Sequence, residues 1–509
     1  MNLLDLAWIP VRGAPRRWLT LAEVTRVPAD AIAAPRADLT CGLLECLVGL
    51  AQLALQPDDD LLIDLDDAPP PADAFAAGLA PWRSAFQLRG EGPLFLQEHD
   101  LPDDADVVPI EKLFLDSSGD YFNKPGTTQA LCPACAAAAL YVHQSRANQG
   151  GRGYRTSLRG GAPLSTLVVP APRAPAPGGT LWRTIFHNLL RAEVLGQLAS
   201  GPLRAEAIFP WLLPERPDQL TTLDVHPLHL WWGMPRRVRL CWTDAPGTCD
   251  LCGEAADATA HAFQRVSLGI NYTGAFCHPQ NPILEDKLGP RCLATSADGV
   301  RYKDWLGLVA GSQGKDQQIT HAAVIRAAHE QGYTLQIRAF GYAMSSAKPL
   351  AWHDRTLPLL DAGPADAGVL AAWIGLAIEA AGYVRSQLLG QIVAAWTTGK
   401  LRGDTAPISN AFWEETEADF FAGVAAVRTG AGTPEARETA SEAWRLALIR
   451  HATALFDRYV QPDVSLGRPL ARVMTAFNRL RATLNGPKLR QALALPLPVK
   501  PTPGKRKKG

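Results

Sequence analysis

The sequence predicts an α+β protein in which an irregular mixed α/β domain, residues 1–365, precedes a carboxy-terminal four-helix bundle, residues 366–490. The chain has 509 residues, whereas a single domain usually holds about 100 to 200. Glycine and proline interrupt the first domain throughout, which favours short elements joined by turns. Helical periodicity then replaces this pattern. A basic tail over 491–509 is predicted to be disordered.

Local patterns predict the elements of the first domain in order. Thr40–Leu55 reads as a helix that Pro57 stops, and Ala68–Ala80 reads as a surface connection. An alanine-rich helix follows Cys132 and extends through His143, before a glycine-rich loop. The later predictions are a strand, a helix, a region of short strands around an aromatic core, and a second strand: Leu164–Val169, Thr180–Ala199, Leu220–Ala310 and Tyr333–Phe340.

Four amphipathic segments make up the predicted bundle. They are Gly368–Thr397, Ala411–Val427, Glu435–Val460 and Leu470–Leu484. The third has strong start signals, with Thr433 as the cap and Pro434 at the first helical position. The apolar run Gly368–Val384 is short and contains Glu379, so it predicts a buried helix and no membrane span.

Charge is unevenly distributed along a chain whose formal net charge is zero. Residues 1–120 hold 21 acidic and 8 basic residues, whereas residues 121–192 hold eight basic residues and no acidic one. Roughly seven acids are expected by chance in the second window. A polyanionic ligand explains their absence, and so does burial of the window. Five glycines favour the ligand, because backbone amides without side chains can line a phosphate path: Gly150, Gly151, Gly153, Gly160 and Gly161.

Two Cys-x-x-Cys pairs are candidate metal ligands, namely Cys132 with Cys135 and Cys249 with Cys252. Each pair places two thiolates on one tight turn, which is half of a tetrahedral zinc site. Because 113 residues separate the pairs, a complete site requires the fold to bring them together. The alternative is a thioredoxin-like redox motif at Cys132 and Cys135, although no βαβ pattern surrounds it. We predict structural zinc.

Signatures of catalysis are weak. Gly311–Asp316 lacks the first glycine of a phosphate-binding loop and has Asp316 where a Ser or Thr would hold magnesium. The eleven histidines show no metal or nuclease spacing, and no G-x-S-x-G occurs. We therefore predict a protein that is not an enzyme. Asp5 and Pro10 interrupt the first apolar run, so no signal peptide is predicted and the expected location is cytoplasmic.

Several stretches together resemble the CasA family, the large subunit of the type I-E CRISPR surveillance complex Cascade. In chain order they are NLLDLAWIPV, CPACAAAALYVHQ, GGRGYRTSLRGGAPLSTLV, FCHPQNPILEDK, WLGLV and FGYAMSSAKPLAWHDRTLP. The resemblance implies a non-catalytic subunit that recognises the PAM, a short motif beside the target, in double-stranded DNA through the minor groove. It also implies promotion of duplex opening and R-loop seeding, and recruitment of the helicase-nuclease for antiviral defence. The implied partners are the small, backbone and handle-binding subunits, CRISPR RNA and target DNA, with no membrane.

The resemblance also implies site residues. The family's glycine loop matches five positions, whose backbone would lie in the minor groove: Ser157, Leu158, Arg159, Gly160 and Gly161. Arg152, Arg155 and Arg159 would hold flanking phosphates, which fixes register without reading sequence. The four cysteines match those that bind zinc in some relatives.

Three further matches complete the implied site. The minor-groove lysine matches Lys287. The wedge that splits the first target base pairs matches a hairpin tip without the Gln or Asn of the family, at Ser345, Ser346 and Ala347. The segment beside the 5′ handle of the guide matches the region before Cys132, with Phe122, Asn123 and Lys124.

Two alternative functions stay open from the residues. A generic zinc-containing nucleic-acid-binding scaffold would show affinity that depends on salt but not on a flanking motif. A zinc-dependent or thiol-dependent enzyme would use Cys132 and Cys135 directly.

Overall fold

A computed structural model describes the chain outside residues 14–15, 27–30, 118–122, 149–150, 152, 173–178, 315, 346, 360–363, 400–402, 461–468 and 498–509, and outside the side chains of 364–367. The chain divides into two compact units. The first holds Met1–Val300 and Gly307–Asp361, and the second holds Arg301–Leu306 and Ala362–Gly509. The predicted mixed fold with a helical carboxy-terminal region is confirmed. The sequence pattern placed the boundary at 365 and did not single out Arg301–Leu306.

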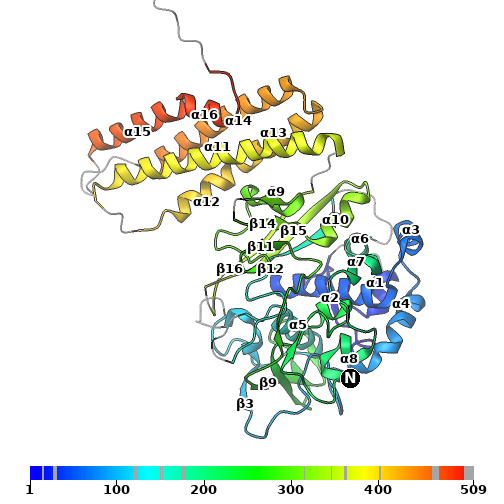
Figure 1. The fold of residues 1–509 in the computed structure, drawn as a ribbon. Coiled ribbons are helices and arrows are strands. Elements are labelled where there is room, and N and C mark those ends of the chain that lie inside the picture. Colours follow the sequence, from blue (N-terminus) through cyan, green and yellow to red (C-terminus); the bar gives the residue numbers. More distant parts are fainter. Residues whose placement is uncertain are drawn as a thin grey trace, which may run out of the picture. The chain divides into compact units, whose positions relative to one another are not determined.

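Helix α2 (Ala37–Leu55) is the central helix of the first unit, and nearly all of its residues are buried (Figure 1). It packs against α4, α5 and α6. The other helices of this unit are α1 (Leu21–Arg26), α3 (Asp59–Asp67), α4 (Ala72–Leu79), α5 (Pro133–Ser145), α6 (Gly179–Phe186), α7 (Ala192–Gly196), α8 (Ala205–Ile208), the last three residues of α9 (Tyr302–Val309) and α10 (Ala323–Glu330). Short 3-10 turns are Ala80–Phe86, Ile110–Leu113, Leu115–Ser117, Pro210–Leu212 and Pro227–Trp231.

The strands of the first unit form several small sheets. Two three-stranded sheets have the orders β16-β15-β4 and β3-β9-β6, and one four-stranded sheet has the order β12-β11-β14-β13. The pairs β1-β2, β7-β8 and β5-β10 stand apart, and β5-β10 is parallel. The bounds are β1 (Ile9–Val11), β2 (Arg17–Leu19), β3 (Asp106–Pro109), β4 (Ser165–Pro170), β5 (Gln219–Leu220), β6 (Arg237–Thr243), β7 (Gly247–Thr248), β8 (Ala255–Ala256), β9 (Thr259–Val266), β10 (Asn271–Tyr272), β11 (Ile283–Asp286), β12 (Gly289–Cys292), β13 (Ser312–Gln313), β14 (Gln318–Thr320), β15 (Leu335–Ser345) and β16 (Lys348–Pro358).

Two predictions for this unit were wrong in part. Ala68–Ala80 contains helix α4, because its alanine-rich sequence favours helix and buries Phe75 and Leu79. Thr180–Ala199 is not one helix but α6 and α7. The chain leaves the helix near Asn188, whose side chain accepts a hydrogen bond from the Val168 amide at 2.9 Å and donates to the Val168 carbonyl at 2.7 Å. Asn188 thereby pairs with the edge of β4.

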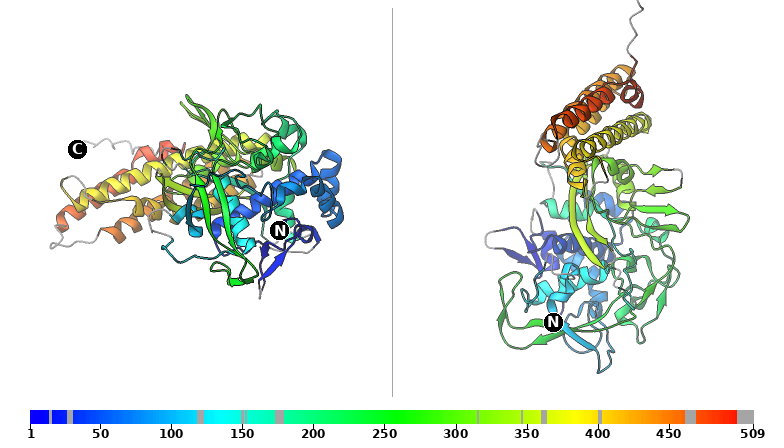
Figure 2. Two further views of the ribbon diagram at one scale, coloured as in Figure 1. Left: turned by 90° about the horizontal axis from the view of Figure 1, so that it is seen from below. Right: turned by 90° about the vertical axis from the view of Figure 1, so that its left-hand side faces the viewer.

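The second unit consists of helices that lie side by side (Figures 1 and 2). They are α11 (Pro364–Trp396), α12 (Ala406–Glu415), α13 (Glu417–Thr429), α14 (Pro434–Tyr459), α15 (Leu470–Leu484) and α16 (Pro487–Ala492). The second predicted segment was wrong as a single helix, because it breaks at buried Thr416. The predicted cap is confirmed, since Thr433 Oγ1 accepts a hydrogen bond from the amide of Ala436.

Within the part of the chain that the structure describes, two helices are long and apolar enough to cross a membrane by length and composition alone. In α2, 83% of the apolar window is buried inside the protein. Helix α11 packs against α13, α14 and α15. The structure thus accounts for α2 as a core helix and for α11 as a bundle helix.

Candidate functional site

The glycine loop, defined as Ser157–Gly161, forms a tight turn before β4. The Gly160 amide donates to the Ser157 carbonyl at 2.9 Å, and Ser157 Oγ donates to the Gly160 carbonyl at 2.9 Å. Ser157 Oγ also accepts from the Arg159 amide at 3.2 Å. Gly160 has a φ of +86°, a conformation that favours glycine over other residues. The Ser157 side chain therefore stabilises the turn through hydrogen bonds to its backbone, and Gly160 adopts the positive φ that the turn requires.

The loop turns its side chains inward and its backbone outward. Ser157, Leu158 and Arg159 are exposed by only 4%, 8% and 2%. Gly160 is exposed, and a Cβ added there would meet nothing within 4 Å. The outer surface at Gly160 is therefore bare backbone beside open space, which suits close approach of a ligand.

Arg159 is part of a buried ion cluster and not of the loop surface. Its Nη1 lies 2.6 Å from Glu45 Oε1, while Arg146 Nη2 lies 2.9 Å from Glu45 Oε2. Ser165 Oγ accepts a hydrogen bond from Arg146 at 2.9 Å. Burial would raise the pKa of Glu45, but the Arg146 and Arg159 charges outweigh it and the pKa is lowered. The expectation that the Arg159 side chain holds a DNA phosphate is corrected, because its guanidinium is buried and paired.

The structure places only some of the other residues expected to contact phosphates or the guide. Arg152 and Phe122 lie outside the described residues. Arg155 is half-buried, and its Nε has no hydrogen-bond partner among the described residues. Asn123 Nδ2 donates to Asp116 Oδ1 at 3.3 Å, and Lys124 is exposed.

The tip of the β15-β16 hairpin meets the segment that precedes the glycine loop. Asn148 Nδ2 donates to the carbonyl of Ala347 at 3.4 Å. Asn148, Tyr154 and Ala347 line one cavity of about 250 Å³. Ser345 is exposed at the end of β15, and Ser346 lies outside the described residues. The structure therefore brings the predicted wedge beside the glycine-rich segment.

Lys287 stands at the exposed tip of the β11-β12 hairpin. The chain after this hairpin runs back to the glycine loop. The carbonyl of Leu293 accepts from the amide of Leu164 at 2.9 Å, and the amide of Thr295 donates to the carbonyl of Ala162 at 2.8 Å. Backbone pairing thus ties the base of this hairpin to the residues that directly follow Gly161.

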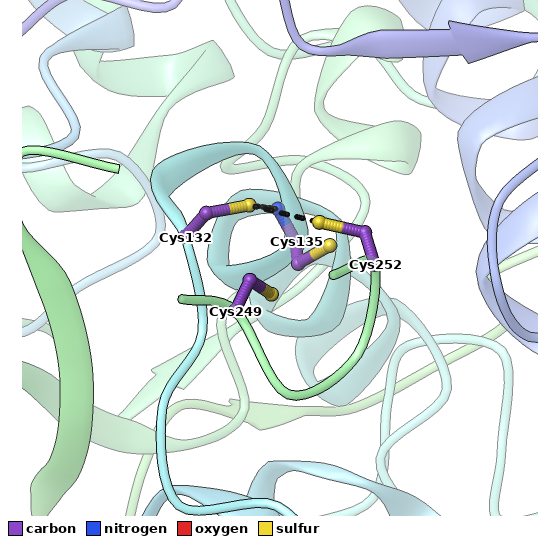
Figure 3. A group of neighbouring side chains, drawn as sticks. All are labelled: Cys132, Cys135, Cys249 and Cys252. Carbon is purple, nitrogen blue, oxygen red and sulfur yellow. Dashed lines mark hydrogen bonds between the residues drawn. The ribbon is translucent and has the colours of Figure 1, made fainter. Parts of the chain in front are cut away.

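The two Cys-x-x-Cys pairs come together, as a four-cysteine site requires. Figure 3 shows Cys132 and Cys135 at the start of α5 facing Cys249 and Cys252 from the turn between β7 and β8. All four sulfurs lie within 4.8 Å of one another. Cys132 Sγ is 3.7 Å from Cys252 Sγ, close to the ~3.8 Å edge of a tetrahedron with metal–sulfur bonds of about 2.3 Å. The cluster has the donor set and spacing for a metal ion.

Backbone pairing holds these two turns in place. The amide and carbonyl of Leu131 both pair with Ala260 at 2.9 Å, one residue before Cys132. The Asp250 carboxylate, one residue after Cys249, accepts from the amides of Gln129 and Ala130 at 2.7 and 2.9 Å. Hydrogen bonds from Cys132 and Cys135 lower the pKa of Cys249, whereas hydrogen bonding within the cluster and burial raise the pKa of Cys132, Cys135 and Cys252. A low thiol pKa favours the thiolate that a metal binds.

Comparison with known proteins identifies the family. The family model of the CRISPR-associated protein Cse1 matches residues 2–455 of the sequence. The chain belongs to the Cse1 family. Cse1 (CasA) of Thermus thermophilus is 20% identical with a TM-score of 0.67, covering 94% of this chain and 99% of its own. Cse1 of Thermobifida fusca is 18% identical with a TM-score of 0.70, covering 97% and 98%. A chain of a CRISPR RNA-guided surveillance complex is 15% identical with a TM-score of 0.61, covering 96% and 99%.

The Cse1 match confirms the resemblance seen in the sequence. The family model ends inside α14, while the structural likeness covers nearly the whole chain. At these identities the structural likeness shows a shared Cse1 fold.

Sequence reasoning missed Glu45, although a signal was present. It is the single charged residue in the predicted apolar helix Thr40–Leu55. A lone acid within such a helix indicates a buried carboxylate with a basic partner. The sequence could not identify the basic partner of Glu45, because Arg159 lies 114 residues away along the chain.

Proposed function

We propose that this Cse1-family chain is the non-catalytic large subunit of an RNA-guided type I-E interference complex, and that its glycine loop reads the PAM through the DNA minor groove. The observation that carries the proposal is the exposed backbone of Gly160 beside inward-facing Ser157, Leu158 and Arg159. The minor groove of B-DNA is only about 6 Å wide, so a loop without an outward side chain enters it most readily. Its degenerate donor and acceptor pattern suits reading a few related motifs.

The surrounding elements would complete DNA recognition. Arg155, and Arg152 beside it in sequence, would hold phosphates that flank the motif. Lys287 would reach the minor groove from the β11-β12 hairpin, and the hairpin tip at Ser345–Ala347 would act as the wedge that starts duplex opening. The contact of Asn148 with Ala347 supports this, because it couples the wedge to the loop segment.

The proposed partners follow from the family. They are the small, backbone and handle-binding subunits, CRISPR RNA, double-stranded target DNA and the helicase-nuclease, in the cytoplasm. Asn123 and Lys124 would contact the guide beside its 5′ handle. The likeness to a chain of a CRISPR RNA-guided surveillance complex supports assembly of this kind.

A structural zinc ion is part of the proposal. Cys132, Cys135, Cys249 and Cys252 would hold it, and it would link α5 to the β7-β8 turn. Four sulfur ligands leave no open position for a substrate or water, which is typical of structural and not catalytic zinc.

The decisive experiment measures binding of the protein, assembled with its partner subunits and guide, to duplex DNA with randomised bases beside the target. We expect the wild-type complex to enrich a short flanking motif and Gly160→Asp to lose this enrichment. The new carboxylate would repel the DNA phosphates, and a side chain at a φ of +86° would strain the backbone. Gly332→Asp is the matched control, since Gly332 is also exposed, has a φ of +71° and faces open space.

The control separates recognition from folding. Gly332→Asp should keep the wild-type flank preference, and both variants should assemble equally. If the wild-type complex enriches no flank, a sequence-blind nucleic-acid scaffold replaces the proposed function. If Gly160→Asp keeps the preference, another element reads the motif.

A further inference from the structure

A cavity of about 250 Å³ lies between the hairpin tip, the segment before the glycine loop and the β3-β9-β6 sheet. Its walls include Asn148 and Tyr154 from that segment, Ala347 from the tip, Arg236 and Phe263. Pockets for drug-sized ligands usually measure about 300–1,000 Å³. This cavity therefore fits one small unit, and not a length of strand.

The cavity is lined by basic side chains. They are Lys112, Arg236, Arg237 and Arg265, and none of the described lining residues is acidic. Arg237 Nε lies 3.2 Å from Glu98 Oε2, and Arg265 Nε lies 3.8 Å from Asp106 Oδ2. These two guanidiniums have carboxylate partners outside the lining.

Arg236 has no such carboxylate partner among the described residues. Its Nη2 donates to the backbone carbonyl of Asn148, and its Nη1 has no hydrogen-bond partner among the described residues. The residue is only 8% exposed. Burial, partly offset by Tyr154, lowers the pKa of Arg236 to about 10. A buried guanidinium without a counter-charge is costly, and an anion bound in the cavity would remove that cost.

Aromatic side chains form the other walls. Tyr154, Phe114 and Phe263 line the cavity. The guanidiniums of Arg236 and Arg265 lie 5.0 and 5.8 Å from the centre of the Tyr154 ring, so the tyrosine is held beside the basic groups. A ligand that fits combines an anion with a flat ring.

We propose that this cavity binds one nucleotide, with its phosphate on Arg236 and its base against the aromatic walls. A guanidinium presents paired donors that match two phosphate oxygens. An aromatic side chain of a partner protein would fill the same walls but leave Arg236 Nη1 unpaired, so the nucleotide is favoured. This inference deepens the proposed function. It rests on that function only where it takes the bound nucleotide to belong to a nucleic-acid strand.

Two fluorescent probes test the site in the full-length protein. One is the 5′-monophosphate of 2-aminopurine riboside, and the other is a short single strand with one internal 2-aminopurine. Arg236→Gln and Tyr154→Ala are compared with Arg239→Gln. Arg239 lies on the same strand, β6, but its Nη1 donates to the His99 carbonyl at 2.9 Å and it does not line the cavity. It therefore controls for the loss of one positive charge.

We expect Arg236→Gln to raise the Kd of at least one probe by about tenfold or more, the usual effect of losing a charged hydrogen bond. Arg239→Gln should change it less than about twofold at moderate salt. Binding of the monophosphate indicates a free nucleotide as the source, and binding of the strand alone indicates a nucleotide within a chain. If neither probe binds, or if the control weakens binding as much as Arg236→Gln, the proposal is overturned.

Tyr154→Ala keeps the proposal testable if Arg236→Gln does not fold. Tyr154 is 37% exposed, so its loss leaves the core packed. It should weaken binding of the same probe and reduce its fluorescence quenching. The outcome is independent of motif reading: a complex that reads a flank through Gly160 but binds neither probe refutes the cavity alone.

Discussion

Glu45 is fully buried and contacts two guanidiniums, those of Arg146 and Arg159. Arg146 ends α5 and Arg159 lies in the glycine loop, so one carboxylate on the central helix holds both ends of the intervening segment. Because the folded pKa of Glu45 is lowered from its ordinary 4.5, its stabilising contribution is present above that value. It is lost as pH falls through the lower folded value. Glu45 is thus a positioning residue for the loop.

Replacing Glu45 tests this role. Glu45→Ala leaves two buried guanidiniums unpaired, so we expect the free energy of unfolding in urea to fall by about 3–5 kcal/mol. Glu442→Ala is the control, because Glu442 forms partly exposed pairs with Arg445 and Arg490 and should cost less than about 1 kcal/mol. If Glu45→Ala lowers the free energy of unfolding by as little as Glu442→Ala is expected to, the buried cluster does not stabilise the fold.

At the scale of elements, the β15-β16 hairpin is placed by close packing at Gly341. Gly341 pairs with His353 in the middle of the hairpin. A Cβ added there would overlap Thr295 Oγ1 and lie 2.5 Å from the carbonyl oxygen of Pro163. Pro163 follows the glycine loop by two residues, so glycine at this position lets the hairpin approach the segment that leads from the loop into β4.

The same substitution at two glycines should have opposite effects. Gly341→Ala forces backbone apart and is expected to lower the free energy of unfolding by about 1–3 kcal/mol. Gly375→Ala, at an exposed position of α11 with nothing near its added Cβ, should raise it by about 0.8–1 kcal/mol. Chemical denaturation of both variants measures the difference. A neutral Gly341→Ala would mean that the loop and hairpin are not held by this contact.

Over the whole molecule, the four cysteines connect the start of α5 to a turn more than a hundred residues later. A metal bound by the four cysteines would cross-link two segments of the first unit that are far apart in the sequence. Because the four thiolates come together only in the folded chain, the free energy of metal binding would add to the free energy of unfolding.

Metal removal distinguishes a structural site from thiol chemistry. We expect about one zinc per chain by elemental analysis. Cys135→Ser should lose the zinc and lower the thermal unfolding midpoint, as should a strong chelator. Cys241→Ser is the control, because that half-buried thiol lies outside the cluster. A metal-free wild type, or a Cys135→Ser that keeps both metal and midpoint, would contradict the zinc proposal. Loss of a redox activity without unfolding would favour the enzyme alternative.

Predictability differed between the two units for a physical reason. Three of the four predicted helical segments of the second unit are confirmed, because helix periodicity and caps such as Thr433 are local properties. The break at Thr416 was not predictable, since its hydroxyl meets Tyr302 from a distant segment at 2.9 Å. In the first unit, Ala68–Ala80 and Thr180–Ala199 were misassigned where burial and pairing with β4 decided the outcome.

The sequence by itself determined the class of the fold, the family, the two cysteine pairs and the glycine-rich character of the loop, because these depend on residue type and short spacing. Tertiary structure decided which charged side chains are paired in the interior and which are not. The sequence alone predicts Arg159 as a phosphate contact, yet its guanidinium pairs with Glu45 of α2 in the interior. Arg236 is buried beside Tyr154 and has no carboxylate partner among the residues that the structure describes. Pairing of charges across the fold depends on contacts between distant segments, and local sequence carries no record of them.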